Sequence, residues 1–356
     1  MITFLPFIIS FIVTIIITPI SISLIKKLGI FDDPKLHKHP AIIHTKPIPR
    51  AGGIPFFIGV AIAVFLFLPM TKIVIALLVA SLISLVIGVL DDKFDISPYF
   101  RFSINIIAAI IVVASGLSIS FITNPFGGIL HLNTIKFTFD LFGIHLTILL
   151  SHIITVIWIV WVMNMLNWSK GVDGQMPGIV AISAIVIGIL SLRFAAIDTT
   201  SLIGIKLSFI IAGASLGFLI FNFHPAKIFP GYGATSIYLL LSAVSILSSA
   251  KLATAILVMG VPMIDGIFTI LRRISTGKSP FWHDKKHLHH LLLGIGVGQR
   301  RIALFYWTIS AILGALSLIL SSKGKAFVIF MVIVFVGGAL FFLHFAIKNS
   351  NEKKNI

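Results

Sequence analysis

Long runs of apolar residues, separated by short polar stretches, occupy almost the whole chain. A run of about 20 apolar residues is long enough to cross a bilayer as an α-helix, and eleven runs come close to this length. They cover roughly residues 3–26, 53–70, 72–90, 101–123, 146–164, 176–194, 202–222, 233–249, 251–271, 302–320 and 325–347. The pattern therefore predicts an all-α integral membrane protein with about 10–11 transmembrane helices.

The polar stretches between the runs are too short for a sizeable soluble domain. We predict a single polytopic membrane domain over residues 1–347, followed by a short charged tail over residues 348–356. The first run has neither a basic segment before it nor a small-residue cleavage site after it. We therefore interpret it as the first span rather than as a signal peptide.

The composition supports a membrane protein and excludes several functions. Of the 356 residues, 58% are hydrophobic and only 11% are charged, whereas soluble domains carry about 25% charged residues. The chain contains no cysteine, which excludes disulfides and thiol chemistry. Its net charge of +16 at pH 7 would suit nucleic acid binding, but no basic aromatic module accompanies it. We therefore predict no nucleic acid partner.

The basic residues are distributed unequally between the two sets of alternating loops. One set, with the flanking Lys26, contains 20 of the 27 lysine and arginine residues. This richer set comprises residues 27–52, 91–101, 165–175, 223–232, 272–301 and the C-terminal tail. Since loops rich in lysine and arginine stay in the cytoplasm, we predict that the N-terminus lies outside and the C-terminus in the cytoplasm.

Acidic residues gather in the same loops, although positive-inside sorting acts only weakly on acids. Nine of the eleven acidic residues lie in or beside the predicted cytoplasmic set. This distribution predicts a site at the boundary between cytosol and bilayer. A transporter more often places ionisable groups near the middle of the membrane, so transport is the disfavoured alternative.

Two adjacent carboxylates, Asp91 and Asp92, end the third apolar run, and Asp95 follows one turn later. Adjacent carboxylates at the end of a buried helix cost free energy unless something neutralises them. A divalent cation held near phosphate groups is the usual reason for such a cluster. The alternative interpretation is a solvated helix end with its charges in water.

The first predicted cytoplasmic loop is rich in proline, which prevents a regular helix over most of its length. Gly52 and Gly53 would allow the backbone to approach a ligand or a neighbouring helix closely. The cations of this loop that could contact phosphate are Lys38, His44, Lys46 and Arg50. For each of them the alternative is an ordinary basic loop on the inner face.

Two further predicted cytoplasmic loops contain candidate binding residues. Asn167 follows Asn164 by three residues and so shares a helix face with it. Asp173 is bracketed by glycines, which suggests a tight turn that presents its carboxylate. Asn222 ends a span, and Phe229 could stack on a base. The alternatives are helix capping for the asparagines and an interfacial anchor for Phe229.

The longest predicted cytoplasmic loop, residues 272–301, is dense in cations and contains His287, His289 and His290. Histidine clusters can bind transition metals, but here no cysteine and few carboxylates accompany them. Binding of a diphosphate by histidine, lysine and arginine fits this composition better. Leucines at 288 and 291–293 predict an amphipathic helix that rests on the membrane surface.

Seven sequence motifs on the predicted cytoplasmic face resemble, in their order, those of one enzyme family. They are DDP at 32–34, PxPRAGG at 47–53, GxxDDxxDxSP at 88–98, NxxN…GxDG at 164–174, FNxxPAKIF at 221–229, VPxxD at 261–265 and RRxxxGKSPFxxDxxHLHH at 272–290. The family is the polyprenyl-phosphate N-acetylhexosamine-1-phosphate transferases (glycosyl transferase family 4), integral membrane enzymes related to phospho-N-acetylmuramoyl-pentapeptide transferase. The resemblance covers roughly residues 3–320, and the HLHH form is similar to the N-acetylglucosamine-1-phosphate branch.

The resemblance implies a reaction. A sugar-1-phosphate, expected to be N-acetylhexosamine-1-phosphate, would move from a UDP-sugar to a polyprenyl phosphate with release of UMP, for cell-wall or surface-glycan synthesis. The implied setting is a bacterial-type plasma membrane, with the active site in cytoplasmic loops and a homodimer as one compatible assembly. Because the site must bring a diphosphate to another phosphate anion, Mg²⁺ and cationic side chains are expected.

The same resemblance implies roles for individual residues. The implied catalytic residues are Asp91, Asp92, Asp173, His287, His289 and His290. The implied substrate-binding residues are Lys46, Arg50, Asp95, Arg101, Lys170, Asn222, Lys227 and Phe229. The implied metal ligands are Asn167, Asp91, Asp92 and Asp173. Asn222 and Phe229 would hold uracil, and the three histidines would contact the diphosphate.

Two positions depart from the family pattern. The family has an aspartate where this chain has Lys170, and a metal-binding aspartate where it has Tyr232. The changes remove negative charge beside the expected Mg²⁺, and Lys170 would offset this loss if it bound the diphosphate itself. They also motivate a second hypothesis, in which the chain binds UDP-sugar or lipid phosphate without transferring anything.

Overall fold

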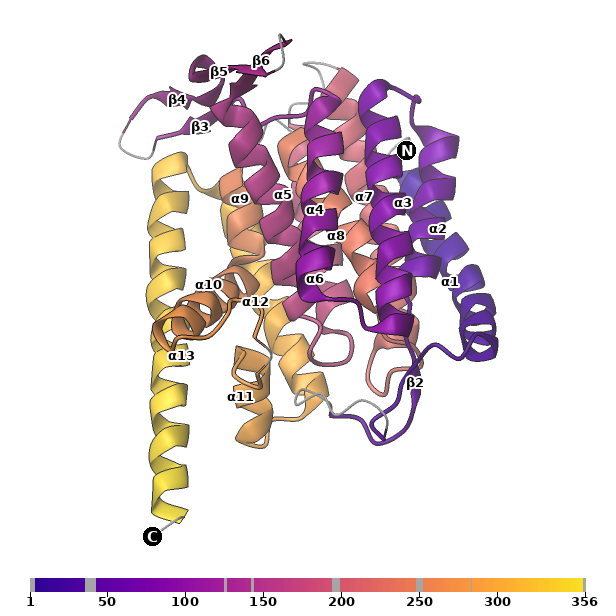
Figure 1. The fold of residues 1–356 in the computed structure, drawn as a ribbon, viewed down its shortest axis with the longest axis vertical. Helices are drawn as coiled ribbons and strands as arrows, with labels where there is room; N and C mark the ends of the chain where they lie inside the picture. Colours follow the sequence, from indigo (N-terminus) through magenta and orange to yellow (C-terminus); the bar gives the residue numbers. More distant parts are fainter. Residues whose placement is uncertain are drawn as a thin grey trace.

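The computed structural model of the protein describes residues 4–35, 43–124, 127–141, 144–193, 199–247, 252–282 and 284–354. The described chain is a bundle of helices with small hairpins at one end (Figure 1). The helices at the positions of the predicted spans are α1 (Phe4–Lys27), α2 (Gly53–Phe67), α3 (Lys72–Phe94), α4 (Pro98–Ala114), α5 (Leu150–Trp168), α6 (Gln175–Leu192), α7 (Thr199–Asn222), α8 (Thr235–Leu247), α9 (Leu252–Val258) with α10 (Gly260–Ser275), α12 (Gln299–Ile319) and α13 (Ser322–Lys354). The predicted all-α membrane fold is confirmed.

The helices differ in how well they match the length of a bilayer. Within the described ranges, seven helices are long and apolar enough to cross a membrane, or eight if the bent pair α9–α10 counts as one span. Helices α2, α4 and α8 are apolar but shorter. Every predicted span therefore has a helix, although three of these helices fall short of the usual crossing length of about 20 residues.

The ninth predicted span is not one straight helix. Helices α9 and α10 meet at 83° at Met259. Pro262 lies in the first turn of α10, where its missing N–H costs nothing, but it could not continue α9. Residues Ile267, Leu271 and Ile274 of α10 are exposed, whereas Asp265 is buried. The break therefore turns an apolar face outward and a polar face toward the protein.

Helix α1 packs closely against α2 and α7 through small residues and hydroxyl groups. Ser10, Thr14 and Thr18 of α1 are fully buried. A Cβ at Gly59 of α2 would lie 1.9 Å from the Thr14 hydroxyl oxygen, and one at Gly213 of α7 would lie 2.2 Å from a backbone oxygen of α1. Small residues at such contacts let helix backbones approach, which is how helices associate where lipid removes the hydrophobic driving force.

Two hairpins lie at the end of the bundle opposite α11 in Figure 1 and were not predicted. They are β3 (Phe121–Thr123) with β4 (Ile129–His131), and β5 (Lys136–Leu141) with β6 (Ile144–Leu149), joined by the short turn η1 (Leu132–Thr134). The prediction of a span over residues 101–123 is therefore wrong at its end. Helix α4 stops at Ala114 because Gly116 follows with a φ of +103°, which a helix cannot accommodate.

Two elements near the C-terminus also differ from expectation. The predicted helix in the long loop exists as α11 (Leu288–Gly294), but Leu288 and Leu291 are buried against the protein core rather than resting on a membrane surface. Helix α13 continues to Lys354 without a break between the last span and the predicted tail. It stands at the edge of the bundle beside α9 and α10 (Figure 1).

Candidate active site

The predicted cytoplasmic loops come together at one end of the bundle, the end marked by α11 and β2 (Ile48–Pro49) in Figure 1. Strand β2 pairs with β1 (Phe31–Asp32) and ties the first loop to the end of α1. The side-chain pairs that join distant segments here are Arg50–Asp92, Asp173–His224 and Asp265–His287. The loops are thus neighbours in space, as the interpretation of one shared site requires.

Asp91 and Asp92 lie near the end of α3 and are only 2% and 4% exposed. The Arg101 guanidinium donates to Asp91 Oδ2 at 2.7 Å, and Arg50 Nε lies 2.8 Å from Asp92 Oδ1. The backbone N–H of Tyr232 also donates to Asp92 Oδ1, at 2.8 Å. Partners of this kind offset the cost of burying a carboxylate. The alternative of a solvated helix end is therefore wrong.

Glycines let the fourth loop close over this carboxylate pair. A Cβ at Gly88 of α3 would lie 2.4 Å from the Cα of Gly233, in the turn η2 (Tyr232–Ala234). Gly231 has a φ of +67°, and a Cβ there would lie 1.9 Å from Asp92 Oδ2. Another residue at 231 would be strained and would also collide with the carboxylate. The end of α3 and the fourth loop are therefore shaped to fit each other.

The two positions that depart from the family pattern lie side by side. Lys170 Nζ donates to the carbonyl oxygen of Gly231 at 3.0 Å and lies 5.8 Å from the centre of the Tyr232 ring. The guanidinium carbon of Arg101 lies 4.8 Å from the same ring centre. Asn105 Nδ2 donates to the Tyr232 hydroxyl oxygen at 3.0 Å. Cations are attracted to the face of an aromatic ring. The Tyr232 ring therefore holds the Lys170 and Arg101 side chains near each other.

Three cationic side chains interact electrostatically with the two buried carboxylates. Arg50 and Arg101 form ion pairs with them, and Lys170 is attracted to both. Burial, together with repulsion from Arg50, lowers the pKa of Lys170 to about 8. Lys170 is therefore still mainly charged at pH 7, so three cationic groups face the two buried carboxylates, and Arg50 also interacts with Asp32 and Asp95 at the margin of the site.

This charge balance does not fit the predicted Mg²⁺ site. Mg²⁺ takes hard oxygen ligands in a near-octahedral shell, usually with carboxylates that offset its charge. Asp91 Oδ1, Asp92 Oδ2 and Asn167 Oδ1 are buried without a hydrogen-bond partner in the described chain, and they are oxygens of a suitable type. However, the charge of each aspartate is already offset by a guanidinium bound to its other oxygen. No group of three or more His, Asp or Glu among the described residues is placed to hold a metal ion.

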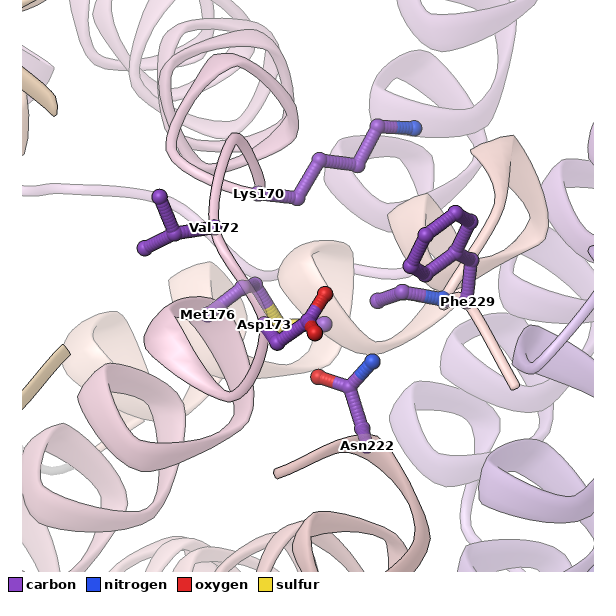
Figure 2. A pocket seen from close by; sticks show the side chains of 7 residues that line it. Lys170, Val172, Asp173, Met176, Asn222 and Phe229 are labelled. Atoms are coloured by element: carbon purple, nitrogen blue, oxygen red, sulfur yellow. The ribbon is translucent and has the colours of Figure 1, made fainter. Parts of the chain in front are cut away.

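A small pocket opens beside Lys170 (Figure 2). Its lining residues are Lys170, Val172, Asp173, Met176, Asn222, Phe229 and Pro230. In Figure 2 the Asp173 carboxylate and the Asn222 amide lie close together, whereas the Lys170 side chain extends past them on the side of Phe229. The pocket thus combines a carboxylate, an amide, an ammonium and an aromatic ring, groups that can contact the edge and face of a nucleobase and an adjoining phosphate. Its free space is about that of one water molecule, so a base would enter only if the lining side chains moved apart.

Hydrogen bonds to the backbone fix the two polar residues of this pocket. Asp173 Oδ2 lies 2.7 Å from His224 Nδ1 and accepts from the Ala226 N–H at 3.1 Å. Asn222 Oδ1 accepts from the Gly174 N–H at 3.1 Å, and its Nδ2 donates to a backbone carbonyl oxygen at 2.9 Å. Gly174 has a φ of +77°, so the predicted tight turn at Asp173 is confirmed. The Asn222 amide therefore stabilises the backbone that forms the pocket.

Phe229 connects the pocket to the first loop. Its backbone N–H donates to the Pro49 carbonyl oxygen at 2.8 Å, and its carbonyl oxygen accepts from the Gly52 N–H at 2.9 Å. Its ring makes an edge contact with the His44 imidazole, with 5.0 Å between ring centres. A half-buried ring fixed in this way fits a binding loop better than an interfacial anchor.

The histidines of the fifth loop form a second cluster, next to the third loop. His287 Nδ1 lies 3.0 Å from Asp265 Oδ2, and the Leu288 N–H donates to Asp265 Oδ1 at 3.1 Å. The His289 side chain is buried, and a Cβ at Gly171 would lie 1.8 Å from its Nε2. Glycine at 171 is therefore what allows the third loop to pack on the histidine cluster.

These histidines are not all cations at neutral pH. Burial lowers the pKa of His289 well below its ordinary value, and His290 and His287 act in the same direction. Burial, followed by repulsion from His287 and Lys285, lowers the pKa of His290 to about 4. Neutral imidazoles can still donate one hydrogen bond to a phosphate oxygen. The cationic charge at this end of the bundle is therefore carried mainly by arginine and lysine.

Some of the predicted site residues lie at the margin of this arrangement. Asp95 is exposed and ends α3 with a φ of +48°. The side chains of Lys46 and Lys227 are also exposed. Lys38 lies outside the described residues. Asp95, Lys46 and Lys227 can therefore meet a ligand only from the solvent side.

Three residues of the site were not assigned a role from the sequence. Asp265 orients His287, His224 lies against Asp173, and Asn105 binds the Tyr232 hydroxyl. The VPxxD motif contained a signal for Asp265. Asn105 lies within an apolar run, where a lone polar residue could have been recognised as a candidate partner for another buried group.

Comparison with known proteins identifies the family. Residues 74–249 match the sequence model described as Glycosyl transferase family 4. The chain is 33% identical over 341 residues to a protein of Bacillus subtilis named probable undecaprenyl-phosphate N-acetylglucosaminyl 1-phosphate transferase, with 93% of this chain and 89% of that protein covered. It is 32% identical over 330 residues to the decaprenyl-phosphate N-acetylglucosaminephosphotransferase of Mycobacterium tuberculosis, with coverages of 83% and 79%.

A third relative is the undecaprenyl-phosphate alpha-N-acetylglucosaminyl 1-phosphate transferase of Escherichia coli. It is 27% identical over 310 residues, with 83% of this chain and 77% of that protein covered. The resemblance inferred from the loop motifs is confirmed, and the chain belongs to glycosyl transferase family 4.

Proposed function

We propose that this enzyme transfers an N-acetylhexosamine 1-phosphate from a UDP-sugar to a polyprenyl phosphate and releases UMP. The observation that carries the proposal is the position of the pocket at Lys170, directly beside the buried Asp91–Asp92 pair at the end of an apolar helix. The names of the relatives, which are transferases of undecaprenyl or decaprenyl phosphate, support a lipid phosphate as the acceptor.

The reaction is an exchange of one phosphorus–oxygen bond for another. An oxygen of the lipid phosphate attacks the phosphorus atom that carries the sugar. The bond from that phosphorus to the UMP phosphate breaks, and UMP leaves with the electron pair. Negative charge is spread over the phosphoryl oxygens during the transfer, and Arg50, Arg101 and Lys170 are placed to stabilise it. No other reactant is consumed.

The geometry also suggests where the two substrates enter. Helix α3 is apolar until its last turn, so the carboxylate pair lies where an acceptor phosphate would sit at the boundary of the bilayer. The donor would approach from the water, with its base in the pocket formed by Asn222 and Phe229. We infer that this face is cytoplasmic, from the excess of lysine and arginine in its loops. The homodimer stays a prediction.

The test uses purified protein, polyprenyl phosphate and a panel of UDP-sugars. We expect release of UMP with one of these donors, in equal amount to a lipid-linked sugar phosphate. Release of free sugar phosphate without a lipid product would contradict the proposal, and so would binding of the donors with no UMP release from any of them. The second outcome would support the hypothesis of a binding protein, which the names of the relatives disfavour.

A further inference from the structure

The charges around the carboxylate pair are arranged to receive an anion. We propose that the ammonium group of Lys170, rather than a resident divalent cation, supplies the positive charge that holds the donor's diphosphate beside Asp91 and Asp92. This inference rests on the proposed function, because the diphosphate is that of the donor.

The first support is the number of cations. The carboxylates of Asp91 and Asp92 are each bound by one guanidinium, so both are neutralised before Lys170 is counted. Adding Lys170 leaves one positive charge in excess among these five side chains, and the Asp173 carboxylate of the neighbouring pocket lies 2.7 Å from His224 Nδ1. A divalent cation placed there would be repelled, whereas a diphosphate would be attracted, and both effects are stronger than in water because the site is poorly solvated.

The second support is the position of the ammonium group. Lys170 lines the pocket that contains Asp173 and Asn222, yet its Nζ reaches out of the third loop to the carbonyl oxygen of Gly231 at 3.0 Å. Figure 2 shows the side chain extending away from Asp173 on the side of Phe229. A ligand whose base occupied the pocket would therefore place its phosphates along this side chain, on the way to the carboxylate pair.

The third support is the hydrogen-bonding capacity of Lys170. An ammonium group carries three N–H donors, and the hydrogen bond to the Gly231 carbonyl oxygen uses one of them. The remaining donors can meet phosphate oxygens without breaking the contact that fixes the side chain. Tyr232, whose ring lies 5.8 Å from Nζ, adds no negative charge at neutral pH and so does not compete with the diphosphate.

The proposal predicts binding of a diphosphate without metal. Binding of UDP to the purified wild-type protein would be measured by calorimetry, first in EDTA and then with added Mg²⁺. We expect binding in EDTA and little change on adding Mg²⁺. Lys170→Met should weaken UDP binding in EDTA by about tenfold or more, because a charge-assisted hydrogen bond is lost, and Lys170→Arg should retain most of it.

A matched control separates the local effect from the loss of any positive charge. Lys93 is exposed at the end of α3 and lies near the ring of Phe94. Lys93→Met should leave UDP binding unchanged. Should Lys170→Met fail to fold, wild type in EDTA and Lys170→Arg still test the proposal.

The inference is overturned if wild type binds UDP only with Mg²⁺, or if Lys170→Met binds it as tightly as wild type in EDTA. Its failure can be told apart from failure of the proposed function. If UMP release proceeds but is abolished by EDTA, the transferase stands and the role of Lys170 is wrong. If UDP binds in EDTA through Lys170 but no donor releases UMP, the anion site stands and the transferase assignment fails.

Discussion

The carboxylate of Asp265 lies 3.0 Å from Nδ1 of His287, and both side chains are buried. An ionised carboxylate only accepts hydrogen bonds, so it holds the imidazole with the proton on Nδ1 and leaves Nε2 for a ligand. Asp265 also accepts the Leu288 N–H, which fixes the start of α11. Asp265 therefore fixes the orientation of His287.

The first prediction follows from this pair. Asp265→Asn should lower the kcat of UMP release by about 10- to 100-fold, the usual effect of removing a residue that orients a working histidine. KM for the donor should change much less, because the pocket proposed to hold the base is formed by other residues. Steady-state kinetics with varied donor measure both. If Asp265→Asn raises KM and leaves kcat unchanged, Asp265 does not act through His287.

The second prediction concerns the buried carboxylates. Asp91→Asn or Asp92→Asn should lower turnover by about 100-fold or more, a typical loss for a group that handles protons or charge in the reaction. Each change also leaves a half-buried guanidinium, Arg101 or Arg50, without its counter-charge. Asp140→Asn, in the hairpin at the opposite end of the bundle, is the matched control.

UMP release and elution on size-exclusion chromatography would be measured for all three variants. Normal turnover in both Asp91→Asn and Asp92→Asn would remove the pair from the mechanism. Loss of turnover in Asp140→Asn as well would show that the assay reports folding rather than chemistry.

The third prediction concerns the pH dependence of kcat/KM, which reports groups of the free enzyme. His290 faces His287, Lys285, Asp265 and Asp284, and burial together with the first two lowers its pKa to about 4. Its imidazole is then neutral from pH 5.5 upward and gains a proton only as the pH falls toward 4. His290→Gln should therefore leave the shape of the profile between pH 5.5 and 8 unchanged. An inflection near pH 6.5 that disappears in His290→Gln would contradict this.

The fourth prediction concerns orientation in the membrane. The chain has no cysteine, so single cysteines can be introduced without removing any. Ser279 lies in the fifth loop at the site end of the bundle. Ser322 is the first residue of α13, which starts at the hairpin end of the bundle (Figure 1). Cysteines at 279 and 322 should react with a membrane-impermeant reagent from opposite sides of sealed cells, with 322 outside. Labelling of both from outside would overturn the predicted topology.

Much of the fold could be predicted because lipid imposes length and polarity on each helix. Each apolar run contains a helix, since an α-helix satisfies its own backbone hydrogen bonds in the bilayer. The sharp break at Met259 was missed because composition does not distinguish a straight run from two short helices whose polar faces turn inward. The strand β3 at 121–123 was missed because its residues, Phe, Ile and Thr, also suit the end of an apolar span.

The sequence motifs named most of the residues that gather at the site, but they did not indicate which of these residues contact one another. The carboxylates, the histidines and Lys170 all came from motifs, because charge is costly near a membrane and stands out in such a sequence. That Lys170 and Tyr232 are neighbours could not be read from the chain, since 61 residues separate Lys170 from the carbonyl group that binds it. Contacts of this kind depend on how four loops pack, which no local pattern encodes.

The last prediction tests the meaning of those two neighbours together. Lys170→Asp with Tyr232→Asp would change the local set from three cationic and two anionic groups to two cationic and four anionic groups. Such a set should attract Mg²⁺ and repel a bare diphosphate. We therefore expect the double variant to lose UDP binding in EDTA and to require Mg²⁺ for any UMP release. Either single change should do less, because neighbouring charges couple.

The measurement is UMP release against Mg²⁺ concentration for wild type, the two single variants and the double variant. Tyr232→Phe is the control for the phenol, because it keeps the ring under Arg101 and removes only the hydroxyl that Asn105 binds. It should retain the wild-type response to Mg²⁺. If wild type is already steeply dependent on Mg²⁺ and the double variant is no different, Lys170 does not stand in for metal charge. If wild type is inert with every donor while the double variant transfers, the native chain is a binding protein that has lost its metal ligands.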